Sequence, residues 1–127
     1  MDMKLELVPV PVSDIDGAKD FYVEKLGFNA DHDTRVGDAV RIVQLTPPGS
    51  ACSIVISTGL GEISDMQPGS VKGLHLVVSD VSKVREWLTG RGVEVGEVVD
   101  HGRGVKMAHL RDPDGNSWEL QEMSWRS

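Results

Sequence analysis

The stretch SDIDGAKDFY at residues 13–22 decides the fold, because it recurs 66 positions later as SDVSKVREWL at residues 79–88. In both copies apolar residues stand at i, i+3, i+6 and i+7, the spacing that places side chains on one face of an α-helix. Ser and Asp at the start of each copy are typical helix caps, and Gly27, Gly90 and Gly92 follow as stop signals. The repeat therefore predicts two equivalent helices in two like modules.

Short apolar runs surround each predicted helix. At the same offset, VPVPV at 8–12 corresponds to LHLVV at 74–78, and these runs predict a buried strand that leads into each helix. Downstream, AVRIVQLTPPG at 39–49 resembles GVKMAHLRDPDG at 104–115, so each module ends in a hairpin. We predict the order βαβββ twice, with strands near 28–33, 39–46 and 51–57 in the first copy and near 93–98, 104–111 and 117–122 in the second.

Turn-forming residues separate these strands. Gly37 and Asp38 predict a two-residue hairpin turn, Pro48 and Gly49 a second turn, and residues 112–116 a longer turn with Gly115 in the left-handed conformation. Residues 58–72 contain Gly and Pro without a clear period, which is typical of a connection. We predict a single domain over residues 1–127, made of a first module at 1–57, a linker at 58–72 and a second module at 73–127.

Composition limits the classes of partner. The 127 residues are 39% hydrophobic and carry a net charge of −7, which argues against nucleic acid or an anionic membrane as a partner. No apolar run approaches the ~18 residues of a membrane span, and the N-terminus MDMKLEL lacks the apolar region of a signal peptide, so we expect a cytoplasmic protein. The single Cys52 is expected to be a buried structural thiol within a strand.

A strand followed by SDIDGAKDFYVEKLGF, with a second half that closes on RDPDGNSWELQE, resembles the vicinal oxygen chelate superfamily. This superfamily includes glyoxalase I, extradiol dioxygenases, and the bleomycin and fosfomycin resistance proteins. The resemblance covers nearly the whole chain. It implies an α+β fold of two βαβββ modules that form an incomplete barrel, usually within a homodimer, with a ligand pocket on the concave side and the helices on the convex side.

In the metal-using members four side chains converge in that pocket and bind divalent iron, nickel, zinc or manganese. The resemblance places these four positions at Leu7, Ser53 (or Val55 on the same face), Gly73 and Glu119. Only Glu119 is a metal ligand, because ACSIVIS at 51–57 contains no His, Asp or Glu in any register. His75 lies two residues beyond Gly73 on the same strand face, so His75 and Glu119 would form half of a metal site. The sequence favours a pocket without metal.

Equivalent strands supply further candidates for the pocket. Gln44 corresponds to His109 and Ile42 to Met107, at positions that alternate with aliphatic residues suited to packing under a helix. The alternative is that Gln44 and His109 lie on a solvated sheet face. Arg41, Lys106 and Arg103 are candidates to neutralise an anionic ligand at the rim, and Trp118 is expected in the core. The predicted ligand-binding residues are Leu7, Ile42, Gln44, Ser53, Val55, His75, Met107, His109 and Glu119.

These residues lead to two main functional hypotheses. The first is a metal-free binding protein of the resistance or sequestration type, whose cavity encloses an aromatic or polyketide-like small molecule. The second is an enzyme: a metal-dependent lyase, isomerase or dioxygenase that uses His75 and Glu119, or a metal-free lyase with Glu119 as the catalytic general base. A third is a purely structural role, with the cavity filled by the protein's own side chains. The expected partners are a small-molecule ligand and a second copy of the chain.

Overall fold

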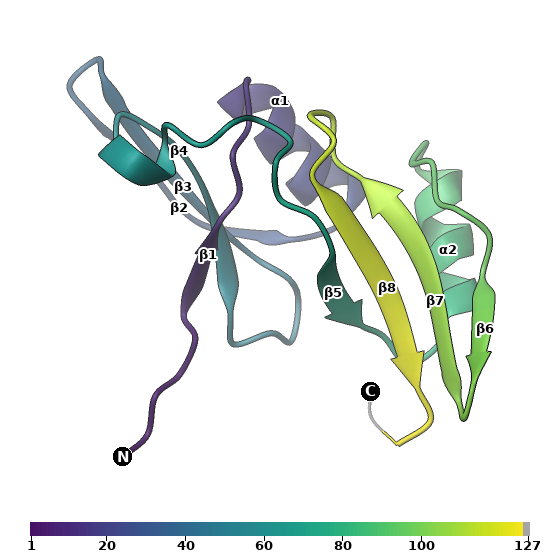
Figure 1. Cartoon of the computed structure of the whole chain (residues 1–127). Helices are drawn as coiled ribbons and strands as arrows, with labels where there is room; N and C mark the ends of the chain where they lie inside the picture. Colours follow the sequence, from purple (N-terminus) through teal and green to yellow (C-terminus); the bar gives the residue numbers. More distant parts are fainter. Residues whose placement is uncertain (126–127) are drawn as a thin grey trace.

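The computed structural model describes residues 1–125 and contains two βαβββ modules that lie side by side (Figure 1). The element order confirms the predicted repeat. The first module consists of β1 (Leu7–Pro9), α1 (Ile15–Asp20) with the π-helical turn η1 (Phe21–Lys25), β2 (Asn29–Val36), β3 (Val40–Thr46) and β4 (Ser53–Thr58). The 3₁₀ turn η2 (Gly61–Ile63) follows. The second module consists of β5 (Leu74–Val77), α2 (Val81–Gly90), β6 (Val99–Gly102), β7 (Val105–Arg111) and β8 (Ser117–Met123).

Each module forms one open four-stranded sheet, with the order β1-β4-β3-β2 in the first and β5-β8-β7-β6 in the second. In both sheets the first strand pairs parallel with the last, and the remaining pairs are antiparallel. Neither sheet closes on itself, as the incomplete barrel implied by the resemblance requires. None of the helices within residues 1–125 is long and apolar enough to cross a membrane.

The helix-facing sides of both sheets share one hydrophobic core. It contains α1 and α2 residues such as Ala18 and Leu88, together with alternate residues of the strands. The four aliphatic residues expected under the helices, Val43, Leu45, Ala108 and Leu110, are at most 2% exposed, which confirms their assignment. Because side chains alternate along a strand, the other face of each sheet points away from this core. Those outward faces carry the predicted site.

A buried polar network joins the two modules at Tyr22. The Tyr22 hydroxyl donates to Asp112 Oδ2 at 2.7 Å and accepts from Trp118 Nε1 at 3.0 Å. Asn116 Nδ2 donates to the same Asp112 oxygen and to the Pro11 carbonyl, both at 2.8 Å. Burial, followed by the nearby Asp112 carboxylate, raises the pKa of Tyr22 well above its usual range. The FY and DPDGNSW motifs therefore belong to one structural unit that fixes module against module.

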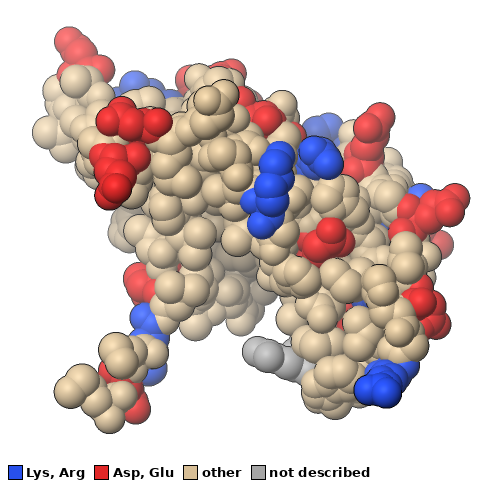
Figure 2. Space-filling view, viewed as in Figure 1, with Lys and Arg blue, Asp and Glu red and all other residues tan. Residues whose placement is uncertain are grey.

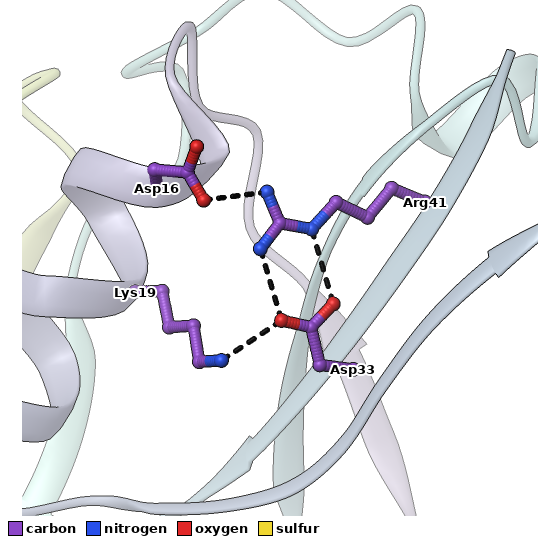
Figure 3. A network of polar contacts seen from close by, with 4 residues as sticks. All are labelled: Asp16, Lys19, Asp33 and Arg41. Atoms are coloured by element: carbon purple, nitrogen blue, oxygen red, sulfur yellow. Dashed lines mark hydrogen bonds and ion pairs between the residues drawn. The ribbon is translucent and has the colours of Figure 1, made fainter. Parts of the chain in front are cut away.

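A group of ion pairs attaches α1 to β2 and β3 of the first sheet (Figure 3). Arg41 on β3 forms two parallel hydrogen bonds with Asp33 on β2, at 3.0 and 2.9 Å, and a third contact with Asp16 at 2.7 Å. Lys19 also binds Asp33. The hydrogen bonds from Arg41 and then Lys19 hold the pKa of Asp33 well below its usual range. Arg41 therefore attaches the first helix to the sheet. These contacts account for the residue without the anionic ligand that was expected from the sequence.

Several boundaries differ from the prediction. Residues 93–98, predicted as a strand, are irregular apart from one bridge between Val95 and Leu110, and β6 begins at Val99. The reason is that Arg85 on α2 donates to the carbonyls of Val95 and Gly96, which are thus drawn toward the helix. The turn at Gly37 contains three residues, because Val36 pairs with Val40.

The helix ends and Cys52 also need correction. Asp80 accepts from the Lys83 N–H as predicted, but Asp14 makes no such bond. Gly90 lies inside α2, so of the two glycines expected to end that helix only Gly92 has a positive φ. Cys52 is half-buried and lies one residue before β4 rather than within it.

Candidate functional site

The outward face of the first sheet gathers the five residues predicted for that module. Leu7 is opposite Ser53, and Gln44 is opposite Val55, across adjacent strands. Gln44 Nε2 donates to Ser53 Oγ at 3.2 Å. Ser53 and Val55 are only 4% and 3% exposed, so contact with a ligand on this face falls to the partly exposed residues Leu7, Ile42 and Gln44.

The outward face of the second sheet is polar. Glu119 on β8 lies opposite His75 on β5 and opposite His109 on β7. His109 Nδ1 and Glu119 Oε1 are 2.7 Å apart. An ionised carboxylate only accepts hydrogen bonds, so Nδ1 carries the proton in this pair. His75 Nδ1 is 2.7 Å from Oε1 of Gln121. His75 and Glu119, which were predicted to form half of a metal site, are therefore bonded to different partners.

Gln121 is a residue of this face that the sequence analysis missed. It lies two positions after Glu119 and hence on the same face of β8. The repeat in the sequence indicates this residue, because the 66-residue offset pairs Gln121 with Val55, a predicted ligand-binding residue of the first module.

A cavity of about 410 Å³ brings together three of the predicted residues, Met107, His109 and Glu119. This volume is in the range of about 300–1,000 Å³ typical of small-molecule sites. The remaining lining comes from Ala108 and from Glu97, Val99 and His101. These last three lie at alternate positions around β6. Val99 and His101 were missed because the predicted strand ended at residue 98, and Glu97 was inside that strand but was not selected.

The other predicted residues lie elsewhere. His75 lines a separate cavity of about 570 Å³, between β5 and the β3–β4 turn at residues 47–51. The residues of the first sheet lie on a different sheet from the 410 Å³ cavity, which is lined by the second module alone. Since both outward faces point away from the shared core, a single chain does not bring the two sets of residues together.

The chemistry of the 410 Å³ cavity is mixed. Val99 and Met107 provide apolar surface, while Glu97, His101, His109 and Glu119 provide polar groups. The Nε2 atom of His109 is covered and has no hydrogen-bond partner within residues 1–125. An orphaned buried acceptor or donor of this kind costs about 1–3 kcal/mol. The bond to Glu119 is the one hydrogen bond that the His109 ring makes within the described residues.

The donor groups do not fit a metal centre. Leu7 and Gly73 offer no donor side chain, and the Ser53 hydroxyl is bonded to Gln44 and lies 2.6 Å from the Thr46 hydroxyl. Glu119 is paired with His109. Within residues 1–125 no three His, Cys, Asp or Glu side chains are grouped so that they could hold an ion. No chemical step is therefore assigned to a metal.

Comparison with known proteins gives one consistent family. The model of the Glyoxalase/Bleomycin resistance protein/Dioxygenase superfamily matches residues 4–120. Among solved structures, TnmS3, an antibiotic binding protein from Streptomyces sp. CB03234, is 36% identical, with 97% of this chain and 98% of that chain covered and a TM-score of 0.83. A glyoxalase/bleomycin resistance protein from the same Streptomyces strain is 38% identical, with 92% and 98% covered and a TM-score of 0.77.

A third similar structure is a member of the same superfamily from Sphaerobacter thermophilus DSM 20745. It is 30% identical, with 95% of this chain and 98% of that chain covered and a TM-score of 0.81. No curated protein sequence matches the chain significantly.

Proposed function

Because the chain belongs to the Glyoxalase/Bleomycin resistance protein/Dioxygenase superfamily, we propose that it binds a small organic molecule without metal, as a sequestration or resistance protein does. The observation that carries the proposal is the 410 Å³ cavity, which combines an apolar surface at Val99 and Met107 with a few fixed polar groups. That combination suits an organic ligand, which gains affinity from apolar burial and orientation from polar anchors. The His109–Glu119 pair supplies the main anchor.

The relatives support an antibiotic as the class of ligand. TnmS3 is described as an antibiotic binding protein, and it resembles this chain over nearly its whole length. An aromatic or polyketide-like antibiotic would lie with its flat faces against the aliphatic side chains and its hydroxyl or carbonyl groups toward His109, Glu119 and His101.

A homodimer is part of the proposal. The outward faces of the two sheets point away from the core of one chain, and Leu7 on the first face is 37% exposed. A second copy would place its first sheet against the second sheet of this chain, so that Leu7, Ile42 and Gln44 would close the cavity opposite Met107, His109 and Glu119. Closed two-fold pairs are the commonest assemblies of soluble chains.

The enzymatic alternative has less support. Glu119 Oε1 is bonded to His109 Nδ1, which leaves only the second carboxylate oxygen of Glu119 to meet either a ligand group or a substrate proton. A metal-dependent lyase, isomerase or dioxygenase would need iron, nickel, zinc or manganese to be held by ligands beyond Glu119 and His75.

Thermal unfolding in the presence of bleomycin, and separately of an anthracycline, tests the proposal. We expect at least one compound to raise the melting temperature in proportion to the logarithm of its concentration. Glu119→Gln and His109→Phe should reduce the shift at least fivefold, whereas Glu86→Gln on the exposed face of α2 is the matched control and should not. Equal shifts in all variants would place any binding outside this cavity.

Metal analysis separates the two classes of function. Protein purified without chelators should contain much less than one equivalent of iron, nickel, zinc or manganese, and EDTA should leave the melting temperature and ligand binding unchanged. A stoichiometric metal that is lost in both His75→Ala and Glu119→Ala would establish the enzymatic alternative instead.

A further inference from the structure

Four polar side chains on the first sheet form one hydrogen-bonded row, here called the Gln44 network. Thr46 Oγ1 donates to the Asp31 carboxylate, and the same Thr46 oxygen lies 2.6 Å from Ser53 Oγ. Gln44 Nε2 is 3.2 Å from Ser53 Oγ. The row therefore begins on β2, passes through β3 to β4, and returns to β3 at Gln44.

The protons of the Gln44 network have one consistent arrangement. An ionised carboxylate only accepts hydrogen bonds, so the Thr46 hydroxyl donates its single proton to Asp31. The contact between the two hydroxyls then needs the proton of Ser53, which Ser53 donates to Thr46. Ser53 has no second proton to donate, so toward Gln44 it only accepts. Gln44 must therefore turn its amide nitrogen, rather than its oxygen, toward Ser53.

The amide of Gln44 is thus held in one orientation and still has unused hydrogen-bonding groups. A primary amide has two N–H donors and one carbonyl acceptor, and Ser53 takes one of the donors. Within residues 1–125 the Oε1 atom of Gln44 makes no hydrogen bond, yet the covered side-chain atom without a partner is His109 Nε2. Oε1 of the half-buried Gln44 is therefore open to solvent.

The surroundings of the Gln44 amide favour an uncharged ligand group. Its neighbours on the outward face are aliphatic, namely Leu7, Ile42 and Val55. Figure 2 shows few charged side chains over β4 and β1, which follow β3 in the sheet. A glutamine amide pairs with a group that carries a donor and an acceptor on nearby atoms. Carboxamides, lactams and imides have this pair without a charge.

We propose that Gln44 is a specificity-determining residue that selects ligands with a carboxamide, lactam or imide group, and that Asp31, Thr46 and Ser53 are positioning residues for its amide. This inference rests on the proposed ligand-binding function and defines a chemical group of the ligand. In a broken network the Ser53 hydroxyl is free to donate to Gln44 Oε1 instead. The amide would then flip and present two N–H donors, which suit a ligand that has acceptors alone.

Two matched probes test the ligand class. Benzamide and acetophenone have the same shape and the same carbonyl group, but only benzamide has N–H donors. NMR titration of the unmodified protein should show about fivefold tighter binding of benzamide, the effect of about one hydrogen bond. This preference should disappear in Gln44→Leu and in Thr46→Val, and it should return in Thr46→Ser, which restores the hydroxyl. Ser57→Ala is the matched control, because the Ser57 hydroxyl on the same strand as Ser53 bonds Ser64 instead.

The side-chain N–H signals of Gln44 test the positioning without any ligand. In the unmodified protein and in Ser57→Ala, one of the two protons should exchange with water more slowly than the other, because Ser53 accepts from it. Ser53→Ala and Thr46→Val should make the two exchange rates equal. Equal rates already in the unmodified protein would overturn the positioning role.

The ligand class is overturned if the unmodified protein binds benzamide no better than acetophenone, including the case in which it binds neither. A preference that survives in Gln44→Leu would overturn it as well. Both results leave the proposed function standing, because the melting-temperature shifts with bleomycin and an anthracycline, and their loss in the Glu119 and His109 variants, decide that function separately.

Discussion

Removal of one oxygen atom, by Tyr22→Phe, is expected to destabilise the protein by about 2–4 kcal/mol. The phenol donates at 2.7 Å to the buried Asp112 carboxylate, and a hydrogen bond to a charged group contributes about 1.5–3 kcal/mol. The substitution also leaves Trp118 Nε1 without its acceptor, and an unsatisfied buried donor costs about 1–3 kcal/mol. Asp112 keeps its bond from Asn116 Nδ2 at 2.8 Å, which holds the sum below the simple total.

Urea unfolding followed by tryptophan fluorescence measures this loss. The midpoint should fall while the denaturant slope stays unchanged, because the folded surface is the same. A domain of this size has about 5–15 kcal/mol of stability, so the loss is a large fraction of the total. Trp118→Phe provides the second side of a double-mutant cycle: once the indole N–H is absent, the Tyr22→Phe step should cost at least about 1 kcal/mol less.

The reasoning fails if Tyr22→Phe costs under about 1 kcal/mol, or if the two substitutions are additive. Either result would mean that the network contributes only packing, since the phenyl ring retains its contacts with Phe28 and Trp118.

The structure leads to three further predictions. Tyr22 is the only tyrosine, and burial raises its pKa in the folded state. Its contribution to stability is therefore complete below pH ~10 and declines above that pH by up to about 1.4 kcal/mol per pH unit. Absorbance at 295 nm should show ionisation of Tyr22 only as the protein unfolds. Asp33→Asn should lower the free energy of unfolding by about 1 kcal/mol or less at pH 7. Because the pKa of Asp33 is lowered in the folded state, the stabilities of variant and parent should converge as the pH falls below ~4, which acid unfolding curves will check. Gly69→Ala should be more destabilising in thermal melts than Gly37→Ala. A Cβ at Gly69 would lie 2.1 Å from the Asp114 carbonyl oxygen, whereas a Cβ at Gly37 would meet nothing within 4 Å. Gly37→Ala should therefore cost only the about 1–2 kcal/mol of its left-handed backbone.

The repeat made the fold predictable from the sequence. A 66-residue offset fixed the element order, and strand alternation assigned Val43, Leu45, Ala108 and Leu110 to the core without any knowledge of the neighbouring elements. The family resemblance added the open sheets. These features depend on local periodicity, which a single sequence contains.

The site was less predictable, because it depends on contacts between distant segments. Val93 and Val95 are buried at alternate positions and look like a strand, but Arg85 donates to the carbonyls of residues 95 and 96. Apart from the single Val95–Leu110 bridge, pairing starts only at Val99. That shift placed Glu97 and His101 in the cavity wall, and no local pattern signals it. Nor does any pattern in the sequence show that His75 bonds Gln121 rather than Glu119.

The two halves differ most where the fold constrains them least. Positions that face the shared core are aliphatic or aromatic in both modules, since they must exclude water. On the outward faces, the equivalent positions have changed character: Ser53 corresponds to Glu119, Gln44 to His109, and Val55 to Gln121. Since Ser53 and Val55 are buried, the first sheet presents aliphatic groups and the Gln44 amide, whereas the second presents imidazole, carboxylate and amide groups. In the proposed homodimer a ligand would have a mainly apolar wall from one chain and a more polar wall from the other, so its orientation would be set mainly by the second module. Substitutions at His109 should then change which ligand is preferred, whereas substitutions at Ile42 should weaken all ligands alike.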